Sequence, residues 1–204
     1  MKISPLFEPD ACQVDALVTC NPFAQLISVS DGGLVATPLP LLFERGPQME
    51  PTLLGHFARA NPQVEALEAR PEALAIFMGP QGYISPSWFT DRTQAPTWNY
   101  ATVHMAVRVS VNRSPSAARE AVERLTEHVE RGRPGAWSPE EMGERYGRLL
   151  GHVVAFRAEV LDIRAKFKLG QNERPDMLAE AIRGAADGGN CPLSAAMRHA
   201  NRQR

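Results

Sequence analysis

Residues 23–43 read FAQLISVSDGGLVATPLPLLF, and this stretch decides the fold class. We expect one strand over Phe23–Ser30 and a second, returning strand over Leu34–Phe43. Asp31-Gly32-Gly33 lies between them, and glycine adopts the positive φ angles that a tight hairpin turn needs. The stretch therefore predicts an antiparallel β-hairpin.

Two prolines interrupt the returning strand, at positions 38 and 40. Proline has no N–H to donate to a neighbouring strand, so it is confined to sheet edges and to places where the chain leaves the sheet. Pro38 and Pro40 therefore predict an edge strand, or a strand whose backbone faces a bound ligand.

Further elements follow from the periodicity of apolar residues. Thr102–Val111 alternates apolar and polar residues, which is typical of a half-buried antiparallel strand. Within 154–167 the apolar residues change phase by one position after Val160, which indicates a β-bulge. Leu53–Ala60 is interpreted as a strand leading into a helix, and Ala73–Met78 as a buried strand that ends at Gly79-Pro80. Helices are expected from Asp10 to Asn21 and over 63–69, 115–131, 138–150 and 174–185, and the last stretch, 192–204, is expected to fray.

These elements predict a mainly β fold with helices, namely a small antiparallel barrel decorated by helices. The sequence has neither a GxGxxG motif after a strand nor a GxxxxGK[ST] motif, which argues against a dinucleotide-binding fold and a P-loop fold. Side chains fill a barrel of this size, so a ligand is expected on its outside or between subunits.

Composition limits the classes of function. The chain has 204 residues and a net charge of −1, so it offers no overall positive charge to nucleic acid or anionic lipid. Its three cysteines, Cys12, Cys20 and Cys191, lack the spacing of a metal site or a disulfide framework. No apolar run reaches the length of a membrane span, and the N-terminus lacks a signal-peptide core. We therefore expect a cytoplasmic protein without a metal site or a membrane contact.

Three short stretches combine cationic, amide and aromatic residues: GHFARANPQ at 55–63, YISPSW at 83–88 and PTWNY at 96–100. A phosphorylated aromatic cofactor needs this combination, because hydrogen-bond donors bind its anion and flat apolar surfaces bind its ring. The stretches therefore predict a cofactor site. No catalytic triad, carboxylate pair or metal-binding histidine motif accompanies them, so no catalytic residue is assigned.

With these stretches the sequence resembles the PaiB family, bacterial proteins described as FMN-binding negative transcriptional regulators. The matching segments are ATPLP at 36–40, GHFARANPQ, YISPSW, PTWNY and KFKLGQN at 166–172. The resemblance implies a split β-barrel like that of pyridoxamine phosphate oxidases, FMN as cofactor, and a homodimer that binds FMN in a groove between subunits. We place the FMN-binding split-barrel domain at 1–172 and a C-terminal helix and tail at 173–204.

The chain departs from the family pattern at four positions. Pro38 stands where the family has histidine, Val64 where it has tryptophan, Phe89 where it has tyrosine and Gly170 where it has serine. Such changes near the expected cofactor can weaken flavin binding or reshape the pocket for another substrate.

The resemblance assigns four residues of the first half of the chain to FMN. His56 and Arg59 lie three apart, so on a helical turn they share a face and converge on the phosphate. Without the resemblance the same pair is interpreted as surface cations. Thr37 and Leu39 are expected to approach the flavin ring through their backbone.

Four further candidates lie later in the chain, and each has an alternative role. Trp98 is either a flavin contact or a core residue, and Asn99 carries an amide that can meet ring heteroatoms. Lys166 either completes the anion site or protects a strand edge as a solvated lysine. Gln171 either contacts the polar rim of the flavin or caps the chain reversal before Pro175.

Two functions in particular stay open at this point. The first is a regulatory flavoprotein like PaiB, but helix 115–131 mixes glutamate with arginine, so we do not expect direct DNA binding. The second is an FMN-dependent oxidoreductase that acts on a small organic substrate at the dimer interface. A binding protein that has kept the barrel and lost the cofactor is a third alternative.

Overall fold

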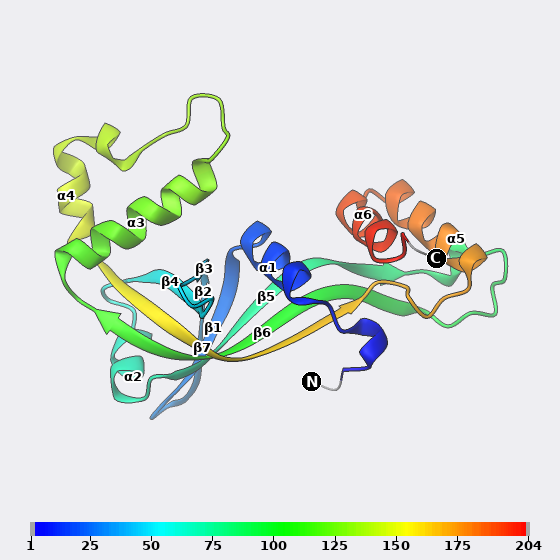
Figure 1. Cartoon of the computed structure of the whole chain (residues 1–204), viewed down its shortest axis with the longest axis horizontal. Helices are drawn as coiled ribbons and strands as arrows, with labels where there is room; N and C mark the ends of the chain where they lie inside the picture. Colours follow the sequence, from blue (N-terminus) through cyan, green and yellow to red (C-terminus); the bar gives the residue numbers. More distant parts are fainter. Residues whose placement is uncertain (1–2, 203–204) are drawn as a thin grey trace. The chain divides into compact units, whose positions relative to one another are not determined.

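The computed structural model describes residues 3–202, which form seven strands, six α-helices and three short 3-10 helices (Figure 1). The strands are β1 (Phe23–Ser30), β2 (Gly33–Pro40), β3 (Leu42–Arg45), β4 (Pro51–Ala58), β5 (Glu72–Ile84), β6 (Thr97–Asn112) and β7 (Val153–Lys168). The helices are α1 (Ala11–Cys20), α2 (Gln63–Ala69), α3 (Pro115–Glu130), α4 (Glu144–Leu150), α5 (Pro175–Asp187) and α6 (Cys191–Ala200), with η1 (Pro5–Phe7), η2 (Pro86–Trp88) and η3 (Pro139–Met142). The expected mainly β fold with helices is confirmed.

The strands form one sheet in the order β2-β1-β5-β6-β7-β4-β3. β1 pairs antiparallel with β2 and β5, and β4 pairs antiparallel with β3 and β7. The expected hairpin is present, with Ser30 opposite Gly33 at its turn. β2 lies at one end of the strand order, as Pro38 and Pro40 predict, because an outer edge needs no N–H from proline.

The chain divides into two compact units that do not follow the order of the sequence. Unit 1 comprises Met1–Leu17, Met78–Val103 and Arg164–Arg204, and unit 2 comprises Val18–Phe77 and His104–Ile163. β5, β6 and β7 therefore each contribute one part to unit 1 and another part to unit 2. The domain boundary expected at 172 stays a prediction.

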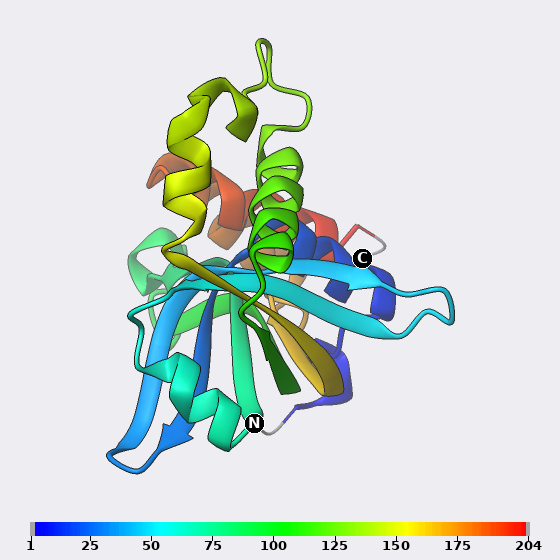
Figure 2. The same cartoon turned by 90° about the vertical axis from the view of Figure 1, so that its left-hand side faces the viewer.

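Within unit 2 the sheet closes on itself. β2 contacts β4, although the two strands lie near opposite ends of the strand order, and such a contact turns a sheet into a barrel. α3 packs on β3 and β4 (Figure 2). Inside, the rings of Phe57 and Phe156 stack with centroids 4.7 Å apart. A Cβ at Gly55 would lie 2.6 Å from the Phe156 ring, so this packing requires glycine at position 55.

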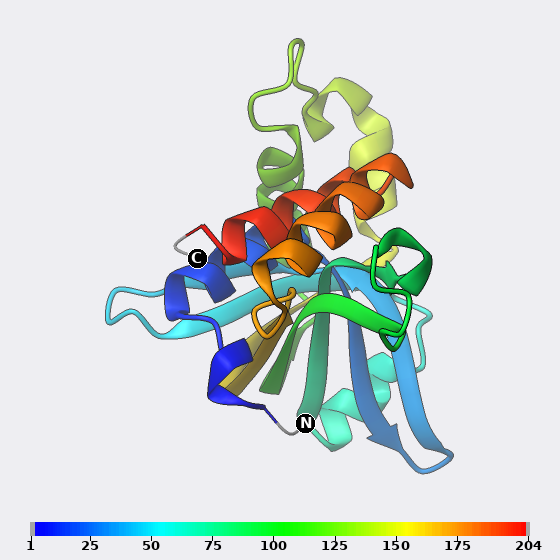
Figure 3. The same cartoon turned by 90° about the vertical axis from the view of Figure 1, so that its right-hand side faces the viewer.

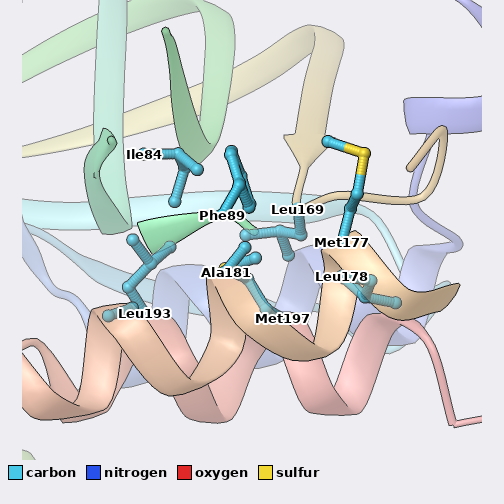
Figure 4. Packing of buried hydrophobic residues seen from close by; sticks show 9 residues of the cluster. Ile84, Phe89, Leu169, Met177, Leu178, Ala181, Leu193 and Met197 are labelled. Carbon is cyan, nitrogen blue, oxygen red and sulfur yellow. The ribbon is translucent and has the colours of Figure 1, made fainter. Parts of the chain in front are cut away.

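Within unit 1 the helices α5 and α6 lie side by side (Figure 3). They enclose a separate apolar core with the ends of β5 and β7, in which Leu169, Leu193 and Met197 are buried (Figure 4). Trp88 packs against this core, and a Cβ at Gly184 of α5 would lie 2.4 Å from its indole. Glycine at position 184 therefore allows the indole of Trp88 to pack directly against α5.

β5 and β4 differ from the sequence-based expectation. β5 continues through Gly79-Pro80 to Ile84, whereas its pairing with β1 ends at Phe77, so the missing N–H of Pro80 loses no hydrogen bond on that side. β4 stays extended to Ala58 and does not turn into a helix, and α2 begins only at Gln63. β4 stays extended because its pairing with β7 continues to Ala58, which lies opposite Val153.

The expected helix over 138–150 is divided in two. η3 ends at Met142, and Gly143 has φ 55° and ψ −135°, a conformation that glycine adopts and an α-helix does not contain. The expected fraying of 192–204 is wrong for α6, in which Leu193 and Met197 are fully buried. Arg204, the last residue of that stretch, lies outside the described residues.

Two finer expectations about strands have different outcomes. The returning strand of the hairpin is split, because β2 ends at Pro40 and β3 begins at Leu42, and Leu41 between them donates its N–H to Pro22 O at 2.8 Å. Residues that share a face of a strand lie an even number of positions apart. In β7, Ala158 is buried and the next buried residue, Ala165, is an odd number of positions away, so the buried face changes between them as expected. The bulge itself stays a prediction.

Candidate functional site

The residues predicted to bind the cofactor divide between the two units. Those of unit 2 are Thr37, Leu39, His56 and Arg59, and those of unit 1 are Trp98, Asn99, Lys166 and Gln171. The structure therefore presents two local arrangements, one in each unit.

Arg59 directly follows β4 and is held by backbone carbonyls. Its Nε donates to Gly151 O at 2.7 Å and its Nη2 donates to Val153 O at 3.1 Å. Among residues 3–202 no carboxylate pairs with this guanidinium, and its Nη1 makes no hydrogen bond there. A guanidinium fixed by neutral acceptors keeps its positive charge for an external anion. Arg59 is thus suited to a phosphate group.

His56 differs from the expectation in both geometry and charge. It lies within β4, where side chains alternate between two faces, so the expected helical turn that aligns His56 with Arg59 is wrong. Its Nδ1 is buried and has no hydrogen-bond partner in the described chain. Burial also lowers the pKa of the ring, which favours the neutral imidazole. An unsatisfied nitrogen on a neutral ring suits a hydrogen bond to a ligand rather than an ion pair with a phosphate.

Thr37 lies beside the turn that carries Arg59. Asn61, which follows Arg59 closely in the chain, is hydrogen-bonded to the side chain of Thr37. Asn61 Nδ2 donates to Thr37 Oγ1 at 3.0 Å, and Asn61 Oδ1 accepts the N–H of Gln63 at 2.9 Å. Leu39 has a different environment, since the residue is 4% exposed and belongs to the core. The expected approach of its backbone to the flavin ring stays a prediction.

Trp98 is a surface residue in unit 1. It is 51% exposed, its Nε1 donates to Gln81 Oε1 at 2.7 Å, and its ring centroid lies 6.1 Å from that of Tyr83. The alternative that placed Trp98 in the core is therefore wrong. The two exposed rings are tilted by 51° to one another and together form an apolar patch for a ligand or a partner chain.

The residues on either side of Trp98 line a cavity of about 280 Å³ in unit 1. Asn99 is 3% exposed, and its Nδ2 contacts Met197 Sδ at 3.7 Å. Lys168 donates to Thr97 Oγ1, and to Trp98 O at 3.2 Å. The pKa of the Lys168 ammonium is lowered, because burial and the charge of Lys166 outweigh the raising effect of the Glu173 carboxylate. The cavity thus combines an amide and a partly desolvated cation.

Lys166 makes its contacts with aromatic rings of the same unit. Its Nζ lies 5.7 Å from the ring centroid of Phe7 and 5.8 Å from that of Tyr100. These are cation–π distances, so the ammonium is stabilised by the protein itself. Its role in an anion site stays a prediction.

Gln171 caps the chain reversal after β7, which is the second of its two expected roles. Its Oε1 accepts the N–H of Leu169 at 2.7 Å, and its Nε2 donates to Phe167 O at 2.6 Å. Gly170 in the same reversal has φ 88°, and a Cβ there would lie 2.8 Å from Leu178 Cδ1. The family's serine would therefore be strained at position 170. Contact between Gln171 and a cofactor stays a prediction.

The remaining departures from the family pattern have separate environments. Val64 in α2 and Phe89 after η2 are buried, so both contribute to packing, whereas Pro38 is exposed. The cavity in unit 1 was not predicted from the sequence, since it joins Ile84 and Phe89 to residues of α5 that lie far along the chain.

Neither a metal site nor a membrane span is found in the part of the chain that the structure describes. Residues 3–202 contain no group of three or more His, Cys, Asp or Glu side chains arranged to hold a metal ion. No helix within that range is long and apolar enough to cross a membrane.

Residues 1–162 match the family described as "Putative FMN-binding domain". The chain is also 36% identical over 153 residues to the Bacillus subtilis protein named "Protease synthase and sporulation protein PAI 2", and the alignment covers 74% of this chain and 72% of the relative. The chain belongs to the PaiB family. FMN is its cofactor, as the sequence predicts.

Solved structures confirm the fold expected for a PaiB-family chain. The flavocytochrome Anf3 from Azotobacter vinelandii is similar with a TM-score of 0.60 at 16% identity, over 79% of this chain and 69% of that chain. The FAD and heme binding protein from Mycobacterium smegmatis is similar with a TM-score of 0.55 at 21% identity, over 78% of this chain and 71% of that chain. This member of the PaiB family is a split-barrel flavoprotein decorated by helices.

The residues of this PaiB-family chain fit FMN by their chemistry. Arg59 brings a positive charge that no carboxylate within residues 3–202 neutralises, which suits the phosphate. His56 brings a buried nitrogen without a partner in the described chain, which suits a polar atom of the cofactor. Trp98 and Tyr83 each bring an exposed aromatic ring, and the face of either ring suits an aromatic ring system.

Proposed function

We propose that the chain is an FMN-dependent oxidoreductase that acts on a small organic molecule. The cavity in unit 1 carries this proposal, because it is lined by Asn99, a predicted flavin contact, and by the ammonium of Lys168. Concave sites with an apolar lining and a few polar groups are where proteins bind small molecules. FMN supplies the electron transfer when it is bound, and the side chains of the protein bind and orient the reactants.

We further propose that the protein works as a homodimer with FMN between the subunits. The predicted cofactor residues lie in two separate units, and a ligand between two copies can contact one unit of each copy. The exposed rings of Trp98 and Tyr83 supply apolar surface that a second copy can cover. In this arrangement Arg59 binds the phosphate of FMN. The second subunit covers the flavin ring and so excludes water from it.

A role in gene regulation is the second candidate. The identity with the Bacillus relative, whose name refers to sporulation, favours it. Direct DNA binding is not part of the proposal, because the arginines of α3 pair with carboxylates: Arg119 pairs with Glu123 at 3.1 Å and Arg124 pairs with Glu120 at 3.4 Å. Arg131, the C-cap residue of α3, pairs with Glu127 at 3.6 Å. A helix whose cations are already paired gains little from DNA phosphates.

Two assays separate these candidates. FMN-loaded protein that oxidises a reduced nicotinamide, with an FMN-free sample as control, supports the oxidoreductase, and no turnover above the rate of free FMN contradicts it. A gel-shift assay at low salt with DNA from upstream of the gene tests direct repression. A sequence-specific shift of this DNA would contradict the proposal that the protein does not bind DNA directly.

A further inference from the structure

The cavity in unit 1 has a polar side and an apolar side. Its lining consists of Ile84, Phe89, Gln94, Ala95, Pro96, Thr97, Asn99, Lys168, Asn172, Glu173, Met177 and Ala181. All of these residues belong to unit 1, so the cavity is complete within one compact unit. At about 280 Å³ it lies just below the usual range for small-molecule pockets, which selects for small ligands.

The apolar side belongs to the packed core of unit 1. Ile84, Phe89, Met177 and Ala181 are all buried members of the core that α5 and α6 enclose (Figure 4). Phe89 supplies a flat face and Met177 an adaptable thioether, which together suit the body of a small apolar ligand.

The polar side holds one cation in a defined place. The Lys168 ammonium has three hydrogens, and two acceptors of the protein, Thr97 Oγ1 and Trp98 O, fix its position. One N–H therefore stays available to a ligand. Both of these acceptors are uncharged, and the carboxylate that acts on the ammonium is that of Glu173, which raises its pKa.

Asn99 and Glu173 restrict the ligand further. Asn99 is 3% exposed, and the one side-chain hydrogen bond that the structure gives it is a long contact to a sulfur, which is a weak acceptor. A buried amide with so weak a partner gains by a hydrogen bond to a ligand. The Glu173 carboxylate accepts from Asn172 Nδ2 at 3.1 Å and carries a negative charge at the same cavity, which disfavours a second anionic group on the ligand.

We propose that this cavity is the substrate pocket and that it binds a small organic monoanion, a carboxylate with an apolar body, through Lys168 and Asn99. The carboxylate accepts from the ammonium and the amide, and the apolar body lies on Phe89 and Met177. The inference rests on the proposed function, since it takes the ligand of the pocket to be the substrate of the flavoprotein.

Three probes of the same size test the charge preference on the unmodified, FMN-loaded protein. Isothermal titration calorimetry is run with benzoate, benzamide and benzylamine, which are an anion, a neutral amide and a cation. Benzoate is expected to bind about 10- to 100-fold more tightly than benzamide, because its bond to the ammonium is charge-assisted, and benzylamine is expected not to bind. Equal binding of benzoate and benzamide, or no binding of benzoate, overturns the inference.

Lys168→Met removes the charge and keeps the length of the side chain. It is expected to abolish the preference for benzoate over benzamide, whereas Lys168→Arg keeps it. Arg92→Met is the matched control, because Arg92 is an exposed cation in the loop before Gln94 and does not line the cavity. A folded Lys168→Met protein that still prefers benzoate over benzamide overturns the inference. If this variant does not fold, the titrations of the unmodified protein with the three probes test the inference alone.

A spectroscopic readout separates this inference from the proposed function. Benzoate is expected to shift the visible absorption band of the bound flavin, as a ligand next to the ring does. Benzoate that binds without any such shift overturns the assignment of a substrate pocket. A yellow protein that binds no benzoate overturns the inference alone, whereas a colourless protein that binds benzoate overturns the proposed function and leaves only an anion pocket.

Discussion

Replacing Arg59 with alanine tests the assignment of the phosphate ligand. Two of the three guanidinium nitrogens are held by Gly151 O and Val153 O, so one nitrogen is available to an external anion. A hydrogen bond to a charged group contributes about 1.5–3 kcal/mol, and about 1.4 kcal/mol corresponds to a tenfold change in Kd. We therefore expect Arg59→Ala to raise the Kd for FMN about 10- to 100-fold.

Riboflavin identifies the part of the cofactor that Arg59 contacts. It has the same ring as FMN and no phosphate, so its Kd is expected to be nearly unchanged in Arg59→Ala. Both dissociation constants are measured by titration of flavin fluorescence. Arg70→Ala is the matched control, because Arg70 is an exposed arginine of the same unit whose charge is already paired with Asp31 at 2.9 Å.

The reasoning is refuted by either of two results with folded protein. One is an equal loss of affinity for FMN and riboflavin, and the other is an unchanged Kd for FMN. Circular dichroism verifies the fold of Arg59→Ala. Its free energy of unfolding is expected to fall by no more than about 1–2 kcal/mol, because water can reach the two carbonyls that lose their donors.

Three further predictions concern stability. Gly55→Ala places a methyl group 2.6 Å from Phe156 Cζ and 2.8 Å from Leu41 Cδ2, and it is expected to lower the free energy of unfolding by about 1–3 kcal/mol in urea titrations. The stability of the unmodified protein is expected to fall as the pH drops below about 6.5, because burial lowers the pKa of His56 in the folded state and the unfolded state takes up the proton first. His56→Asn is expected to reduce the slope of this part of the stability curve, and His104, whose pKa burial also lowers, accounts for the rest. Gly170→Ser restores the family residue at a φ of 88° and is expected to lower the free energy of unfolding by about 1–3 kcal/mol.

Each of these predictions has a control or a contrary outcome. Gly32→Ala is the control for Gly55→Ala, because the nearest atom to its added Cβ is Ser30 Oγ at 3.8 Å. An unchanged urea midpoint in Gly55→Ala would contradict the close packing of β4 on β7. A pH dependence as steep in His56→Asn as in the unmodified protein would assign the effect to another group, such as His104. A Gly170→Ser protein as stable as the unmodified one would contradict the strained reversal after β7.

Features that depend on neighbouring residues were predictable from the sequence. The Asp31-Gly32-Gly33 turn fixes the hairpin of β1 and β2. Ser114 caps α3, with its Oγ accepting the N–H of Ala117 at 3.2 Å. Pro38 and Pro40 indicate an edge strand because the missing donor is a local property of proline.

Features that depend on distant residues were not predictable. Gly79-Pro80 carries a turn signal, but β5 stays extended there, at a point where its pairing with β1 has ended. The sequence predicts Arg59 as a phosphate ligand, but it does not predict what holds the guanidinium in place. The carbonyl that accepts from its Nε belongs to Gly151, 92 positions away. The cavity in unit 1 likewise joins the loop before β6 to α5, and no local pattern relates these segments.

Retention of FMN by the full chain tests the central claim most directly. The purified protein is incubated with FMN, desalted, and examined by visible absorption together with its protein concentration. The account predicts a flavin band that corresponds to one bound FMN per chain. A colourless protein after desalting would contradict it.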